Sequence, residues 1–79
     1  MTSDQEPTTF RAAREAIGFS QADVRALVRT LTGRRLDPTT TMRWDAGRSD
    51  CPPGMLALLE LLRRLPEAER KRVLARFGF

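Results

Sequence analysis

The sequence predicts an all-α domain with five helices, and three observations support this prediction. Apolar residues recur every three or four positions, which places them on one face of a helix. Residues that cap helix N-termini stand before these stretches, namely Thr9, Ser20 and Asp37. Residues that end helices in a left-handed conformation follow them, namely Gly18, Gly33 and Gly47.

The first predicted helix is capped by Thr8 or Thr9 and has an apolar inner face. That face is formed by Phe10, Ala13 and Ile17. Two arginines of this helix, Arg11 and Arg14, are expected on its outer side. A solvated surface explains them at least as well as contact with a phosphate.

The second predicted helix has the clearest start in the sequence. Ser20 can cap the backbone N–H of Asp23 while the Asp23 carboxylate reaches back to Ser20, and Phe19 can pack on Val24 as a hydrophobic staple. The apolar stripe continues through Leu27, Val28 and Leu31. Gln21 lies in the first turn, where a helix N-terminus can meet a phosphate. Completion of the cap is an equally good explanation of Gln21.

The third predicted helix, from Asp37 to Gly47, suits contact with DNA. Asp37 is the N-cap, and Pro38 takes the first helical position, where its missing N–H is not needed. Thr41 and Trp44 share the face expected to pack inward. The opposite face carries Thr39, Met42, Arg43 and Ala46, with Thr40 at its margin.

The connection before this helix is basic. Arg34 and Arg35 could hold the DNA backbone while Leu36 turns inward, although loop arginines are often simply solvated. After it, residues 48–54 are rich in turn-forming residues and cannot continue a helix.

Two further helices complete the chain. A leucine-rich core helix is predicted over residues 55–65, and Pro66 starts the last one. Their apolar surface is large for so small a fold and predicts a homodimer interface. The residues expected there are Leu62, Leu65, Phe77 and Phe79. The competing interpretation is that all of them belong to the core of the monomer.

Length and composition limit the class of protein. The 79 residues suffice for one domain, and a hydrophobic content of 41% supports a compact core. Residues 1–7 lack periodicity, so we expect a disordered tail there and the domain over residues 8–79. No apolar run reaches the length of a membrane span, and the polar, acidic start does not resemble a signal peptide. We therefore expect a cytoplasmic protein without membrane contact.

The residue types give no reason to expect an enzyme, a metal, a cofactor or a small-molecule substrate. Cys51 is the single cysteine and histidine is absent, so an internal disulfide is excluded and a zinc site would lack its usual ligands. Carboxylates occur singly at caps and turns rather than in converging pairs. Cys51 is expected to be a small loop residue rather than a redox sensor.

The net charge of +4 is unevenly distributed. Eight arginines lie between residues 11 and 48, against Glu15, Asp23, Asp37 and Asp45. A basic face favours a polyanion because binding releases counterions. A genome that prefers arginine codons would produce the same composition, so charge alone does not decide the partner.

Three stretches together resemble the lambda-repressor-like, Cro/CI-type (XRE) helix-turn-helix family. They are Arg-Ala-Ala-Arg-Glu-Ala-Ile-Gly-Phe-Ser-Gln-Ala-Asp-Val at 11–24, Asp-Pro-Thr-Thr-Thr-Met-Arg-Trp-Asp-Ala-Gly-Arg at 37–48, and Pro-Pro-Gly followed by the leucine-rich helix at 52–65. Each stretch is weakly specific alone, but together they cover most of the chain. The resemblance implies a five-helix bundle whose third helix enters the major groove of DNA.

The resemblance places Gln21 at a phosphate, Thr39, Thr40 and Arg43 in the recognition helix, with Arg43 at a base or at the backbone, and Trp44 as the buried aromatic. Together with the residue patterns described above, it gives the following set of expected roles. Base contacts are expected from Thr39, Thr40, Met42 and Arg43. Backbone contacts are expected from Ser20, Gln21, Arg34, Arg35 and Arg48. The recognition helix is expected to be held by Asp37, Thr41 and Trp44.

Two features depart from the family pattern. The stretch from Val28 to Leu36 is roughly six residues longer than the usual tight turn, so either the second helix is extended or the turn is a loop. Arg25 stands where the family usually has a small residue.

The sequence therefore predicts a sequence-specific DNA-binding regulator, a repressor from a phage or other mobile element that binds an inverted repeat in double-stranded DNA as a homodimer. Small regulators of this kind also accompany anti-CRISPR genes and toxin operons, and the residues do not choose among these settings. The alternative is a protein-interaction module, such as an antitoxin or a phage adaptor, that uses the helical fold to bind a protein.

Overall fold

The computed structural model describes residues 9–79, so the expectations about a tail at residues 1–7 and a cap at Thr8 lie outside it. The described chain is all-helical, which confirms the predicted class. Its elements are α1 (Phe10–Ala16), α2 (Gln21–Thr32), α3 (Pro38–Asp45), α4 (Pro53–Arg64) and α5 (Glu67–Ala75).

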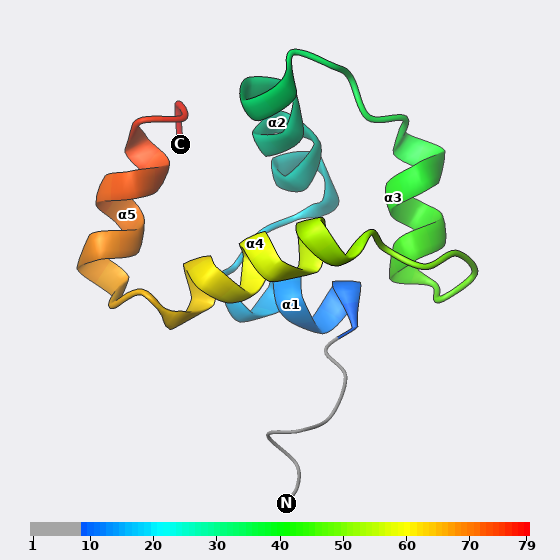
Figure 1. Ribbon diagram of the computed structural model, residues 1–79, viewed down its shortest axis with the longest axis horizontal. Helices are drawn as coiled ribbons and strands as arrows, with labels where there is room; N and C mark the ends of the chain where they lie inside the picture. Colours follow the sequence, from blue (N-terminus) through cyan, green and yellow to red (C-terminus); the bar gives the residue numbers. More distant parts are fainter. Residues whose placement is uncertain (1–8) are drawn as a thin grey trace, which may run out of the picture.

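The five helices form a flat body that measures 36 × 31 × 18 Å along its principal axes. In Figure 1, α1 and α4 lie across the middle, and α3 and α5 lie at opposite ends of the long axis. Contacts between helices join α1 to α4, α2 to α3, and α1 to α3. One end of the molecule therefore carries α3, which is held by α1 and α2.

The capping residues act as the sequence predicts. The Thr9 hydroxyl accepts a hydrogen bond from the Ala12 N–H. Ser20 and Asp23 form a complete capping box, with 3.0 Å in each of its two hydrogen bonds. Gly33 ends α2 in the left-handed region at φ +74°, which glycine adopts without a steric penalty.

The core lies where α1, α2 and α4 meet, and α5 adds one side chain to it. Phe19 and Val24 are both buried in this cluster, as the predicted staple requires. The buried apolar residues are Phe10, Ala13, Phe19, Val24, Leu27, Leu59, Leu62 and Leu74.

The structure buries Leu62, one of the four residues predicted for the dimer surface, and leaves the other three partly or largely accessible. Leu62 is buried inside the chain's own core, and Leu65 and Phe77 pack against that core. Phe79 turns back from the end of the chain and stacks on Phe19, with 5.1 Å between ring centroids. Phe79 is nevertheless 42% exposed, so the structure removes only Leu62 from the predicted interface, and the homodimer stays a prediction.

The boundaries of the last two helices differ slightly from the prediction. The core helix α4 begins at Pro53 rather than Met55, and Pro66 is the N-cap of α5 rather than its first residue. No helix in residues 9–79 combines the length and the apolar character needed to cross a membrane.

Substitution of two leucines of α4 tests this core, because they differ most in solvent exposure. Leu59 is fully buried and Leu61 is 64% exposed. We expect Leu59→Ala to lower the free energy of unfolding by about 2–5 kcal/mol because it leaves a cavity. The control Leu61→Ala should stay within about 0.5 kcal/mol of wild type. Urea titration followed by circular dichroism measures both, and equal losses would contradict this packing.

Candidate nucleic-acid interface

Helix α3 begins and ends where its sequence dictates. The Asp37 carboxylate accepts a hydrogen bond from the Thr39 N–H at 2.7 Å, and Pro38 occupies the first helical position. The helix ends at Asp45, and Gly47 follows with φ +74°. The result is a short, eight-residue helix with defined ends.

The inner face of α3 is fixed by Thr41 and Trp44, as predicted. Thr41 is fully buried, and its hydroxyl donates to the Pro38 carbonyl and accepts from the Arg25 guanidinium, both at 2.9 Å. Trp44 is half-buried rather than enclosed, and its ring meets Phe10 edge to face with 5.3 Å between centroids. Arg25, which departs from the family pattern, therefore links α2 to α3 through its hydrogen bond to Thr41.

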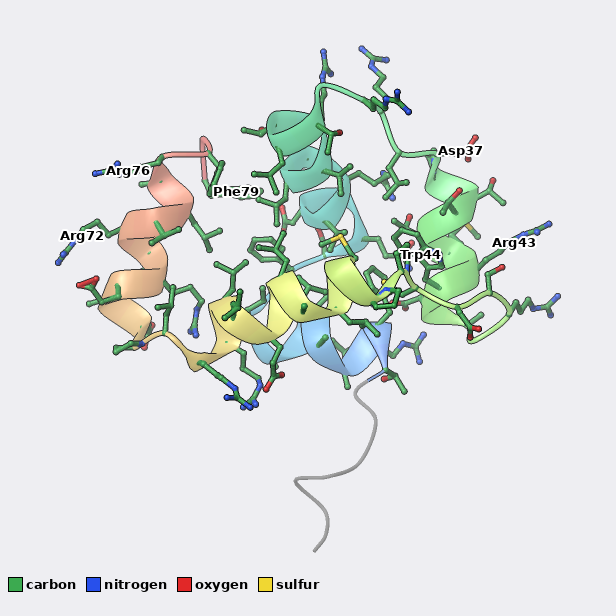
Figure 2. The ribbon with its side chains drawn as sticks, in the orientation of Figure 1. Asp37, Arg43, Trp44, Arg72, Arg76 and Phe79 are labelled. Atoms are coloured by element: carbon green, nitrogen blue, oxygen red, sulfur yellow. The ribbon has the colours of Figure 1, made fainter. Side chains whose placement is uncertain are left out.

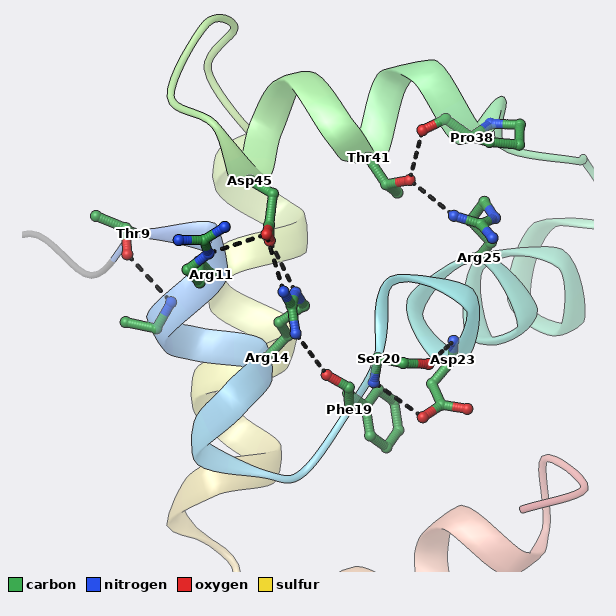
Figure 3. A network of polar contacts seen from close by, with 11 residues as sticks. Thr9, Arg11, Arg14, Phe19, Ser20, Asp23, Arg25, Pro38, Thr41 and Asp45 are labelled. Atoms are coloured by element: carbon green, nitrogen blue, oxygen red, sulfur yellow. Dashed lines mark hydrogen bonds and ion pairs between the residues drawn. The ribbon is translucent and has the colours of Figure 1, made fainter.

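An ion pair holds the C-terminal end of α3 against α1 (Figure 3). The Arg14 guanidinium makes two hydrogen bonds to the Asp45 carboxylate, with Nε–Oδ1 at 2.7 Å and Nη2–Oδ2 at 2.8 Å. Its third donor, Nη1, reaches the Phe19 carbonyl at 3.0 Å. Arg11 adds a contact from Nε to Oδ2 at 3.0 Å. This two-pronged geometry is the strongest arrangement available to a carboxylate and an arginine.

The expectation that Arg14 lies on the outside is wrong. Its side chain is 13% exposed and that of Asp45 is 4% exposed, whereas the side chain of Arg11 is 61% exposed, as predicted. Hydrogen bonding from Arg14, aided by Arg11, lowers the pKa of Asp45 from 3.8 to about 2 although burial opposes the shift. The same hydrogen bond raises the pKa of Arg14. Both groups therefore stay charged at neutral pH.

The outer face of α3, formed by Thr39, Met42, Arg43 and Ala46, is exposed. Together with Arg48 these residues line a shallow depression, and Met42 is 60% exposed. Figure 2 shows Arg43 pointing away from the body of the protein while Trp44 turns toward it. Thr40 is half-buried at the margin. The predicted arrangement of side chains around α3 is thus present, and DNA contact by them stays a prediction.

The other residues expected at the DNA backbone lie at two places. Gln21 is half-buried in the first turn of α2, beside Ser20, whose hydroxyl is engaged in the capping box. Arg34 and Arg35 are exposed in the loop between α2 and α3, and Arg48 is exposed after α3. The stretch that departs from the family pattern contains both an extended α2, which runs to Thr32, and a loop.

The basic side chains fall into two groups, according to whether they pair with a carboxylate. In α1, α4 and α5, most of them pair with carboxylates: Arg11, Arg14, Arg63, Arg64, Lys71 and Arg72. Between residues 25 and 48, none lies within 4.0 Å of a carboxylate of the described chain. That second set is Arg25, Arg29, Arg34, Arg35, Arg43 and Arg48. In the described chain most arginines without a carboxylate partner therefore lie in α2, in α3 and in the loops on either side of α3, and Arg70 and Arg76 are the exceptions.

Cys51 lies in the turn before α4 and is half-buried. Burial raises the pKa of its thiol to about 11, which suppresses the reactive thiolate. Within residues 9–79 no three His, Cys, Asp or Glu side chains converge where a metal ion could be held.

No match was found when the chain was compared with models of protein families, with curated proteins and with solved structures. Its function is therefore inferred from the side chains around α3.

The sequence analysis did not predict that three residues hold α3 in place: Arg14, Arg25 and Asp45. Arg14 follows Phe10 by four positions, so it borders the apolar face of α1, and this spacing is a usable signal. Asp45 follows Trp44 and is separated from Arg14 by 31 positions, so local patterns do not connect the pair.

The ion pair makes a prediction about stability and pH. Because the pKa of Asp45 is lowered on folding, its contribution is present above about pH 4 and is lost as the pH falls toward 2. Asp45→Asn should cost about 3 kcal/mol at pH 7, since Arg14 keeps a nearly buried charge without its partner. The difference between variant and wild type should shrink by about 2 kcal/mol between pH 4 and pH 2.

Urea unfolding at several pH values measures this difference. Glu69→Gln is the matched control because Glu69 pairs with Arg72 at the exposed surface, and we expect it to cost less than about 1 kcal/mol. A difference for Asp45→Asn that does not change with pH would contradict the role assigned to the pair.

Proposed function

We propose that the chain is a small sequence-specific DNA-binding regulator of the lambda-repressor-like helix-turn-helix type, a binding protein rather than an enzyme. The observation that carries the proposal is the contrast between the two faces of α3. Its inner face is anchored by Thr41, Trp44 and Asp45, while its outer face exposes hydroxyls, a thioether and a guanidinium. A rigidly held helix with such an outer face suits the major groove.

The side chains of the outer face match the chemistry of base edges. The Arg43 guanidinium can bind guanine O6 and N7 with two hydrogen bonds. The hydroxyl and methyl groups of Thr39 and Thr40 can contact base edges or a thymine methyl, and Met42 offers a further apolar contact. In this proposal these four residues read sequence.

Backbone contacts are assigned to the residues that flank this helix. The N-terminus of α2, with Ser20 and Gln21, offers backbone N–H groups and a partial positive charge to a phosphate. Arg34, Arg35 and Arg48 are exposed cations on both sides of α3. Such contacts fix orientation on the duplex without carrying sequence information themselves.

We further propose that the protein acts as a homodimeric repressor of a phage or other mobile element, which blocks a promoter by occupying an inverted repeat. An anti-CRISPR operon that encodes its own repressor is one setting that fits this proposal. Two-fold symmetry in the operator would mirror the two-fold symmetry of the dimer.

A second candidate function is a protein-interaction module. It is favoured by an apolar groove between the end of α2 and the start of α4, whose lining includes Val28, Leu31, Leu36, Met55 and Leu58. Leu31 is 47% exposed there. Weak binding to duplex DNA that does not depend on salt would favour this candidate, whereas DNA binding must weaken steeply as salt rises.

Substitution of Arg43 tests base recognition. We expect Arg43→Ala to cost about 1–3 kcal/mol of specific binding and to relax the preference at one base position. Fluorescence anisotropy with the selected site and with single-base variants measures both effects. Arg76→Ala removes the same charge from the opposite end of the molecule and should leave the preference unchanged. Equal losses on every sequence would make Arg43 a phosphate contact instead.

Selection of binding sites from random duplexes tests the regulator and its symmetry. We expect an inverted repeat with half-sites about one helical turn apart, which survives competitor DNA. Sedimentation of the protein with the selected site gives the stoichiometry. A single, asymmetric half-site bound by one chain would contradict the homodimer while leaving DNA recognition in place.

The spacing of the half-sites also locates the interface between the two copies. Each protomer is 36 Å long with α3 at one end, and one helical turn of DNA is about 34 Å. With the long axes along the DNA, contact through the α5 ends would separate the two α3 helices by about two turns, so half-sites one turn apart would argue against that interface.

A further inference from the structure

A second positively charged feature lies beside α3, in the part of the chain that departs from the family pattern. The last turns of α2 and the loop after it border a groove that is open to solvent and lies next to the first residue of α3. Its lining consists of Arg25, Ala26, Arg29, Arg35, Leu36 and Pro38. Three arginine residues therefore line one concave surface.

These charges have no carboxylate to offset them within the described chain. Arg25 and Arg29 stand one turn apart on α2, where like charges repel one another. The two nearest carboxylates along the sequence are engaged as caps, because Asp23 accepts the Ser20 N–H and Asp37 accepts the Thr39 N–H. None of the three arginines forms an ion pair among residues 9–79. An anion in the groove would relieve this repulsion.

The groove is also partly preorganised. The position of Arg25 is fixed by α3, because its Nη1 donates a hydrogen bond to the buried Thr41 hydroxyl at 2.9 Å. Arg29 and Arg35 are exposed, so their planar guanidinium groups are free to turn toward a ligand. Leu36 and Pro38 form apolar walls that reduce the hydration of the site. Two guanidinium groups that turn toward the same ligand can each donate to the tetrahedral oxygens of a phosphate.

We infer that this groove binds one backbone phosphate of the DNA duplex, outside the base pairs contacted by α3. The inference rests on the proposed function and extends it, because it places Arg25 and Arg29 beside Arg35 at one phosphate, whereas of these three the sequence assigned only Arg35 to the backbone. It explains why α2 continues to Thr32 and a loop follows, since this extension is what brings Arg29 and Arg35 to the side of α3. The same guanidinium, that of Arg25, borders the phosphate and holds Thr41, so the contact supports the position of α3.

The double variant Arg29→Ala/Arg35→Ala tests the phosphate site, with Arg25 left in place because it holds α3. We expect the slope of log affinity against log salt concentration to fall by about 0.9, the value for one phosphate contact. At 0.1 M salt this corresponds to a loss of roughly eightfold in affinity. The loss should be the same on the selected site and on a random-sequence duplex, because a phosphate contact carries no sequence information.

Two control variants separate a local contact from a change in overall charge. Arg72→Ala/Arg76→Ala removes two arginines from α5, at the far end of the molecule, and should leave the slope unchanged. Arg29→Lys/Arg35→Lys retains the charges and should restore the slope. Circular dichroism confirms that each variant folds, as expected for exposed side chains.

The outcomes distinguish this inference from the proposed function. If the wild type binds its selected site with a steep salt dependence and Arg29→Ala/Arg35→Ala keeps the same slope, the phosphate site is wrong and the regulator stands. If the wild type shows no salt-dependent affinity for duplex, both are wrong.

The phosphate bound in the groove could belong to a free anion instead of the DNA backbone, and a second experiment distinguishes the two. Inorganic phosphate and sodium chloride are compared at equal ionic strength by thermal unfolding. A rise in melting temperature with phosphate that Arg29→Ala/Arg35→Ala abolishes, together with an unchanged salt slope for DNA, would assign the groove to a free phosphate and overturn the contact with the duplex.

Discussion

The structure depends on the ion pair between Arg14 and Asp45. A helix as short as α3 is only marginally stable in isolation, because it forms too few backbone hydrogen bonds to offset the cost of starting a helix. The pair joins its C-terminal end to α1, and the same guanidinium holds the Phe19 carbonyl at the start of the segment that leads into α2. Three consecutive helices are thus oriented by one side chain. With Thr41 and Trp44 as further anchors, the direction in which α3 presents its outer face is fixed.

Local features of the fold were predictable from the sequence, and the reasons are physical. Capping at Ser20 and Asp37 and termination at Gly33 depend on residues within four positions of one another, so sequence alone contains the interaction. The division of α3 into an inner and an outer face follows from helical periodicity. The failures concern contacts between distant segments. Arg14 was expected in solvent because its partner lies 31 positions away.

The aromatic end of the chain shows the same limit. The number of apolar residues in α4 and α5 was evident, but which of them face the core depends on the direction of α5 after the turn at Leu65. That direction brings Phe79 back onto Phe19 and leaves Leu62 inside. Counting apolar residues therefore does not reveal that Leu62 belongs to the core while Phe79 stays partly exposed.

The state of Cys51 has a consequence for how copies of the chain associate. Burial raises the pKa of its thiol to about 11, so little thiolate forms at neutral pH, and the chain contains no other cysteine. Oxidative cross-linking between protomers is accordingly disfavoured. Any association between copies of the chain is then noncovalent and depends on protein concentration.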